Sequence, residues 1–266
     1  MNILNRCLIP SWPAPKNVRA LQTTRQGGVS AAPYDSLNLG DHVGDAPLAV
    51  ARNRILLNNL LPGEPVWLEQ VHGTIVASAD NASCLPQADA CIARHRAAVC
   101  VVMTADCLPV LLCDTQGSVV GAAHAGWKGL AAGVIEATVQ AMDVAPQQLM
   151  AWMGPAISQH AFEVGDEVRA AFVAAQPQSA AAFTPSPWSG EGVDSSLPSR
   201  ERVPVRAREG MKYMADIYAL ARLRLNALGI TQIYGGGNCT FRDSERFFSY
   251  RRDGATGRMG TFIWLE

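Results

Sequence analysis

The sequence predicts a mixed α/β fold, and two features of its apolar pattern support this. Residues 90–93, 99–103 and 108–113 are short, nearly continuous apolar runs, which are typical of strands buried on both faces. Longer segments with helical periodicity surround them, and the clearest of these, residues 213–228, stops at Gly229, a residue favoured just after a helix end. We therefore expect several helices packed on sheet faces.

The other elements follow from local signals along the chain. Asp45, with a proline two residues later, is an N-cap candidate for the first helix. The three glycines from Gly235 are expected to form a loop after a strand. Strands are further expected at residues 18–24, 65–71, 118–123, 150–153, 247–250 and 259–264, and helices at residues 45–60, 129–142 and 163–175.

Composition limits the partners of this protein. A formal net charge of −1, with 48% apolar and 17% charged residues, gives no reason to expect nucleic acid or an anionic membrane as a partner. No apolar run approaches the roughly 20 residues of a spanning helix, and no secretory signal is visible at the N-terminus. We expect a cytoplasmic protein, a monomer or weak homodimer.

Residues 176–206 differ in composition from the rest of the chain. They are rich in Pro, Ser, Ala and Gly, which favours a surface insertion over a segment that covers the core. The cysteine count of seven is odd. Cys91, Cys100 and Cys113 lie in strand-like runs, and we expect them to be buried as small apolar residues in a reducing compartment.

The segment from Val99 to Gly129 combines strand-like pattern with reactive chemistry. Cys107 interrupts two apolar runs, and His124 ends a third. With His72, at the end of an earlier predicted strand, they offer one thiolate and two imidazoles, a donor set that suits zinc and leaves a fourth position open. Spacing alone leaves two alternatives: packed turn residues, or a Cys107 nucleophile activated by a histidine.

Further polar residues surround this hypothetical site in the sequence. Asp106 adjoins Cys107 and is a candidate for proton transfer beside a metal, although it would equally cap a turn. Arg25, Arg54, Lys128 and Arg251 are candidates for binding phosphate or a carboxylate, the alternative for each being an ordinary surface or ion-pair role. The ring of Tyr250 is a candidate for stacking on a base, with core packing as its alternative.

Motifs spread over nearly the whole chain resemble the YfiH-like family, also called the laccase-domain or polyphenol oxidase family. They occur in order, with residues 176–206 as the exception. The matching motifs are T-R-Q-G-G-V-S from Thr24, S-L-N-L-G-D-H-V-G-D from Ser36, N-R at Asn53, Q-V-H-G-T from Gln70, Q-A-D-A from Gln87, T-A-D-C-L-P-V-L-L from Thr104, A-H-A-G-W-K-G from Ala123, G-P-A-I-S from Gly154, G-G-N-C-T from Gly236, and F-F-S-Y-R-R-D and T-G-R from Phe247 onward.

The resemblance implies one domain over residues 1–266, built as a four-layer α/β/β/α sandwich of mixed sheets. It implies zinc held by His72, Cys107 and His124, and an enzyme that acts on purine nucleosides. The activities implied are phosphorolysis of adenosine, inosine, guanosine and methylthioadenosine, and deamination of adenosine.

Asn38 and Gln70 join Tyr250 as candidates for sugar or base contacts, with Arg54, Lys128 and Arg251 as candidates for phosphate. Two other functions stay open. One is a hydrolase that edits peptidoglycan precursors with Cys107, and the other is a polyphenol oxidase that uses copper. Multicopper clusters require many imidazoles, usually in H-x-H pairs, and this chain has five histidines and no such pair.

Overall fold

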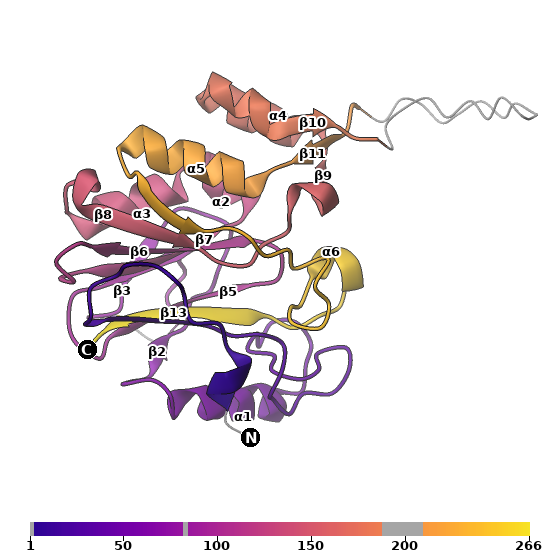
Figure 1. Ribbon diagram of the computed structural model, residues 1–266. Helices are drawn as coiled ribbons and strands as arrows, with labels where there is room; N and C mark the ends of the chain where they lie inside the picture. Colours follow the sequence, from indigo (N-terminus) through magenta and orange to yellow (C-terminus); the bar gives the residue numbers. More distant parts are fainter. Residues whose placement is uncertain (1–2, 82–84, 188–209) are drawn as a thin grey trace, which may run out of the picture.

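Residues 3–81, 85–187 and 210–266 are described by the computed structural model, in which two stacked sheets carry helices on their outer faces (Figure 1). The larger sheet has the strand order β12-β8-β6-β7-β4-β3. Its central strands pair antiparallel and its two edge strands pair in parallel, so the sheet is mixed. Its strands are β3 (Val76–Ser78), β4 (Ala90–Ala93), β6 (Leu108–Asp114), β7 (Val120–Ala125), β8 (Leu149–Met153) and β12 (Gln232–Gly235).

The smaller sheet of the sandwich has the order β1-β13-β5-β2. The C-terminal strand β13 lies between β1 and β5 and is antiparallel to both, although β5 is distant in sequence. The short strand β2 completes the sheet in parallel with β5. The strands are β1 (Val18–Gln22), β2 (Pro65–Val66), β5 (Val99–Thr104) and β13 (Met259–Leu265).

The helices and the two sheets form layers in the α/β/β/α order that the family resemblance implies. Strand β7 of the larger sheet packs against β5 and β13 of the smaller one. Helices α2, α3 and α5 cover the outer face of the larger sheet, and α1 covers the outer face of the smaller sheet (Figure 1). This confirms the four-layer α/β/β/α sandwich. The helices of these layers are α1 (Pro47–Asn58), α2 (Trp127–Ala132), α3 (Val134–Met142) and α5 (Ile217–Leu228).

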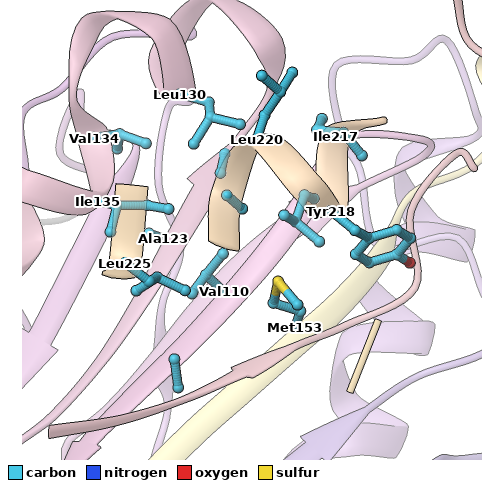
Figure 2. Packing of buried hydrophobic residues seen from close by; sticks show 14 of the residues in the cluster. Val110, Ala123, Leu130, Val134, Ile135, Met153, Ile217, Tyr218, Leu220 and Leu225 are labelled. Carbon is cyan, nitrogen blue, oxygen red and sulfur yellow. The ribbon is translucent and has the colours of Figure 1, made fainter. Parts of the chain in front are cut away.

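Apolar side chains fill the space between the sheets and the space under the helices. Between the sheets, Cys91 and Leu111 meet Cys100, and Cys113 is also fully buried, which confirms the predicted burial of these cysteines. Burial raises the pKa of the Cys113 thiol to about 12, so this group is un-ionised at neutral pH. Under α5, the residues of one helix face meet side chains of β6 and β8 (Figure 2). These helix residues are Ile217, Leu220, Ala221 and Leu225, and the strand residues are Val110 and Met153.

The predicted helix over residues 213–228 begins later than its apolar pattern indicated. Its first residues, Tyr213–Ala215, form strand β11. The helix begins after Asp216, whose side chain accepts a hydrogen bond from the backbone N–H of Ala219 at 3.0 Å, an N-cap that the apolar period conceals. Gly229 ends it with a left-handed φ of 90°, as predicted. No helix within the described residues is long and apolar enough to cross a bilayer.

Glycines divide two other predicted helices. The helix over residues 129–142 is two helices, α2 and α3, because Gly133 takes a left-handed φ of 101° between them. The predicted helix over residues 163–175 starts only after Gly165, as α4 (Asp166–Ala175), and the two residues before this glycine, Glu163–Val164, form strand β9.

Two predicted strands are wrong over most of their length. In residues 65–71 only Pro65–Val66 pairs with another strand, because the residues that follow turn toward the loop before β4. Residues 247–250 form no strand, although Phe247 and Phe248 are fully buried. The hydroxyl of Ser249 accepts a hydrogen bond from the N–H of Arg252 and so begins the short helix α6 (Tyr250–Asp253).

The first helix and the predicted insertion also differ from expectation. Asp45 does not cap α1, which begins at Pro47, because its carboxylate accepts hydrogen bonds from the side chains of Ser30 and Asn38. Residues 177–185 are part of the folded core: a 3-10 helix leads into strand β10 (Phe183–Pro185), which pairs with β11 in a sheet of order β10-β11-β9. Phe183 is buried against this core, and the predicted insertion from residue 188 to residue 206 lies outside the described residues.

Candidate metal centre

The three predicted ligands reach one point from three separate connections. His72 lies in the loop between β2 and β3, with a left-handed φ of 62°. Cys107 ends the turn that carries the chain from β5 in the smaller sheet to β6 in the larger one. His124 is near the end of β7 and pairs in register with Pro109, two residues after Cys107. The β6–β7 pairing therefore brings the thiol and the second imidazole together.

The distances fit a single ion of the expected kind. The Nε2 atom of His72 lies 3.8 Å from the Sγ atom of Cys107, and the ligand atoms of all three residues lie within 4.8 Å of one another. Zinc bonds of about 2.3 Å to sulfur and about 2.0 Å to nitrogen in tetrahedral geometry would place sulfur and nitrogen about 3.6 Å apart. Within the described residues no other group of three or more such side chains gathers in this way.

The centre is buried on one side and open on the other. His124 is 3% exposed, Cys107 is half-buried and His72 is exposed. Three protein ligands that face solvent on one side leave room for a fourth, exchangeable ligand, which is characteristic of catalytic rather than structural zinc sites. The arrangement favours a reaction centre that a small molecule can reach.

Asp89, at the start of β4, organises two of the ligands although the sequence did not single it out. One oxygen accepts hydrogen bonds from His124 Nδ1 at 2.8 Å and from the backbone N–H of His72 at 2.9 Å. The other accepts the N–H groups of Val71 at 3.1 Å and Gly73 at 2.6 Å. Because Nδ1 of His124 is bonded to the carboxylate, its Nε2 is directed toward the thiol. These contacts hold the pKa of Asp89, which burial alone would raise, below its ordinary value.

Two glycines in the segment after His124 are required for the ligands to approach. A Cβ atom on Gly126 would lie 2.8 Å from Cδ2 of His72 and 2.9 Å from Sγ of Cys107. A Cβ atom on Gly129 would lie 2.9 Å from the carbonyl oxygen of Gly73, in the loop that carries His72. The A-H-A-G-W-K-G motif therefore leaves free the space beside the donor atoms.

The charges at the centre favour a thiolate beside an imidazolium when no ion is bound. Burial alone would raise the pKa of Cys107, but His124 and His72 outweigh burial and lower this pKa to about 6. Burial alone would lower the pKa of His124, but Cys107 and Asp89 raise it to about 9. A thiolate is the form that binds zinc, so the site supplies the ligand already deprotonated at neutral pH.

Asp106 lies beside the centre with its carboxylate in use. One oxygen accepts the hydroxyl of Thr240 at 2.6 Å, and the other accepts the backbone N–H of Arg251 at 2.7 Å. Its left-handed φ of 92° sharpens the turn before Cys107. Asp106 thus joins the turn to the C-terminal loops, and each of its oxygens keeps capacity for a further hydrogen bond.

Three other predicted residues lie on segments that adjoin the centre. Gln70 bonds the backbone of Met103 in both directions, at 2.7 and 2.8 Å, and so ties the His72 loop to the end of β5. Lys128 is exposed, two residues after Gly126, and its ammonium lies 5.7 Å from the ring centre of Trp127. Tyr250 is 62% exposed at the start of α6.

The other four predicted residues each make hydrogen bonds or ion pairs within the protein. The guanidinium of Arg251 donates to the carbonyl of Glu163. Arg25 pairs with Asp35, and Arg54 pairs with Asp41 and stacks on Trp67 at 4.0 Å. The amide of Asn38 is fully buried and bonds Gly40, Asp45 and the backbone N–H of Arg258.

The fold and the site together define a small α/β sandwich protein with an open His–Cys–His donor set that could hold one metal ion at the junction of its sheets. The chain belongs to the family described as multi-copper polyphenol oxidoreductase laccase, whose model matches residues 19–266. The family description speaks of several copper ions, whereas the described residues of this chain gather ligands for one ion.

Named relatives and solved structures cover almost the whole chain. A purine nucleoside phosphorylase of Pseudomonas aeruginosa is 51% identical over 99% of this chain and 100% of its own length. The purine nucleoside phosphorylase YfiH of Escherichia coli is 48% identical over 98% of this chain and 100% of its own. A crystal structure of a Neisseria meningitidis protein has a TM-score of 0.86 and 49% identity, covering 98% of this chain and 99% of its own.

Proposed function

We propose that this protein is a zinc enzyme that cleaves purine nucleosides with phosphate. The observation that carries the proposal is the set of two imidazoles and one thiol within 4.8 Å, organised by Asp89 and open to solvent. The names of the relatives, purine nucleoside phosphorylases at 48–51% identity over nearly full length, support the choice of substrate. The substrates we propose are adenosine, inosine, guanosine and methylthioadenosine, with deamination of adenosine as a second reaction.

In this proposal His72, Cys107 and His124 hold the ion. A bound zinc ion would supply a Lewis acid in a partly dry site, and copper is the alternative metal for the same donors. Asp89 orients the imidazole of His124 and holds the backbone of His72, and it lies too deep to touch a substrate, since it is fully buried. Asp106, which is 9% exposed and adjoins Cys107, is the candidate for moving a proton during deamination.

Phosphorolysis requires an anion site next to a sugar site. A phosphate oxygen bonds the anomeric carbon of the ribose while the bond from that carbon to the base breaks, and the base leaves with a proton. Cationic groups must hold phosphate against the positive charge that develops on the sugar. We assign nucleoside contacts to Gln70 and the exposed ring of Tyr250, and assistance to phosphate binding to Lys128 and Arg251. Arg25, Asn38 and Arg54 act in this proposal by shaping the loops around the pocket, because the two arginines are held in ion pairs and Asn38 is fully buried.

The test is metal analysis of the purified protein together with turnover of each nucleoside with and without phosphate. We expect about one zinc per chain and release of free base that depends on phosphate. Cys107→Ala should lose zinc and turnover while the circular dichroism spectrum stays native. Cys7→Ser is the matched control, because this part-buried thiol donates to the carbonyl of Ile3 and lies among the residues under α1, outside the site. Full turnover by Cys107→Ala would reject the proposal.

A second candidate function rests on the lowered pKa of Cys107. A thiolate beside a histidine is also the signature of a cysteine nucleophile, which would make the protein an amide hydrolase acting on cell-wall precursors. A covalent adduct on Cys107 in zinc-free protein during turnover of such an amide would favour this function. Turnover that requires zinc and leaves Cys107 unmodified would reject it.

A further inference from the structure

Arg258 lies beside the metal centre, although it is distant from all three ligands in the sequence. It directly precedes β13, whose first residue, Met259, pairs with Thr104, the last residue of β5. The turn that ends at Cys107 begins immediately after Thr104, so Arg258 flanks this turn. Its guanidinium is close enough to interact electrostatically with Cys107 and Asp106.

Among the residues that the structure describes, no group of opposite charge is in ion-pair contact with Arg258. Its Nη1 atom donates to the carbonyl oxygens of Thr256 and Gly257, both at 3.1 Å. Among the described residues, Nε and Nη2 have no hydrogen-bond partner, and no carboxylate lies within 4.0 Å of the group. The side chain is half-buried, and burial lowers the pKa of Arg258. A partly desolvated guanidinium with two free donor nitrogens is suited to an anion whose two oxygens accept parallel hydrogen bonds, such as a carboxylate or phosphate.

The other arginines of these loops differ from Arg258 in this respect. Arg25 and Arg54 pair with Asp35 and Asp41, and Arg252 pairs with Asp253. The predicted phosphate ligand Arg251 donates to a backbone carbonyl. Arg258 therefore combines proximity to Cys107 with a partly buried guanidinium that makes no ion pair, whereas Arg25, Arg54 and Arg252 are held by carboxylates and Arg251 is exposed.

The position of Arg258 is fixed before any ligand arrives. Its backbone N–H donates to the side-chain oxygen of Asn38 at 2.9 Å, and its carbonyl accepts the N–H of Leu39 at 3.1 Å. Its stem packs on Gly40 so tightly that a Cβ atom there would lie 2.8 Å from Cγ of Arg258. The guanidinium also lies 5.9 Å from the ring centre of Tyr250. Preorganisation of this kind reduces the entropy cost of binding.

We propose that Arg258 is the principal phosphate-binding residue of this site, and that it holds inorganic phosphate next to the metal ligands through Nε and Nη2. The inference rests on the proposed phosphorolysis for its choice of anion. It assigns to the loop of Asn38, Leu39 and Gly40 the task of aiming this side chain.

The test measures phosphate binding directly, so that it does not depend on turnover. Isothermal titration of inorganic phosphate into the zinc-loaded full chain is compared for wild type, Arg258→Gln, Arg258→Lys and Arg19→Gln. Arg19 is the control because it is an exposed arginine on β1, paired only with Glu266 at the C-terminus. We expect Arg258→Gln to raise the Kd for phosphate at least about tenfold, the loss expected for charge-assisted hydrogen bonds, and Arg19→Gln to leave it unchanged.

The Lys variant decides the question if Arg258→Gln fails to fold, since lysine keeps the charge and loses the forked donors. A Lys variant with native zinc content and a Kd raised at least about threefold supports the proposal. The proposal is overturned if a folded Arg258 variant binds phosphate with the Kd of the wild type. It is also overturned if Lys128→Gln, and not the Arg258 variants, loses phosphate binding, or if the wild-type protein binds no phosphate. Phosphate binding that depends on Arg258 in a protein that cleaves no nucleoside supports the phosphate site and rejects the proposed phosphorolysis.

Discussion

Asp89→Asn tests how far the metal centre depends on a residue that touches no substrate. The carboxylate accepts four hydrogen bonds, from His124, His72, Val71 and Gly73. Asparagine offers one acceptor oxygen, so two donors lose their partner, and bonds to a charged group are worth about 1.5–3 kcal/mol each. Because the loop N–H groups can turn to water, we expect unfolding free energy to fall by about 3 kcal/mol, the low end of that sum. Zinc affinity should fall about 10–100-fold.

Asp80→Asn is the matched control for this substitution. Asp80 accepts hydrogen bonds from the backbone N–H groups of Arg94 and His95, which follow β4, whereas Asp89 precedes this strand. Each carboxylate therefore stabilises a loop at one end of β4 by accepting backbone hydrogen bonds. Urea unfolding of the zinc-free proteins measures stability, and competition with a chelator measures zinc affinity. We expect the control to lose stability and keep its zinc affinity. If both variants bind zinc as tightly as the wild type, the orienting role of Asp89 is refuted.

Three further perturbations test other parts of the centre. Gly126→Ala places a methyl group against the donor atoms and should weaken zinc binding at least about tenfold. Gly237→Ala is the control, because its added methyl group meets nothing within 4 Å, and it should leave zinc affinity unchanged. Equal zinc affinities of the two variants in a chelator titration would contradict this. In zinc-free protein, alkylation of Cys107 by iodoacetamide should rise with pH through about 6 and then level off, since the thiolate reacts; a midpoint above about pH 8 would show that the imidazoles do not stabilise it. Gln70→Ala removes two hydrogen bonds to Met103 and should raise KM for the nucleoside more than it lowers kcat. Steady-state kinetics measures both constants, and a loss confined to kcat would contradict a binding role of Gln70.

The grouping of His72, Cys107 and His124 could be predicted because the chemistry of these residues conflicts with their local pattern. Cys107 interrupts buried strands and His124 ends one, and a core has no use for either group at those points. The burial of Cys91 and Cys100 followed from the same apolar runs. The four-layer arrangement came from resemblance, because local periodicity does not say which strands share a sheet.

Asp89 and Arg258 escaped prediction for a different reason. In the sequence Asp89 stands between two alanines, where it resembles a turn residue, and its role depends on a loop that returns to it from Val71 to Gly73. Arg258 reaches the centre only through the pairing of β13 with β5, which joins the end of the chain to its middle. Such long-range contacts leave no local periodicity. The wrong strand prediction for residues 247–250 has a local cause, because the hydroxyl of Ser249 caps helix α6 within this segment.

The location of the centre explains why both sheets are needed for function. The turn from Ala105 to Cys107 is the crossing between the sheets, so the thiol is held by β6 on one side and by the end of β5 on the other. His124 and Asp89 belong to the larger sheet, whereas Arg258 is delivered by β13 of the smaller one. The spacing between metal ligands and the proposed phosphate site is therefore set by the packing of the two sheets. A core substitution that shifts the sheets, far from any ligand, should impair phosphate use before it impairs zinc binding, because His124 and Asp89 stay with the larger sheet while Arg258 moves with the smaller one.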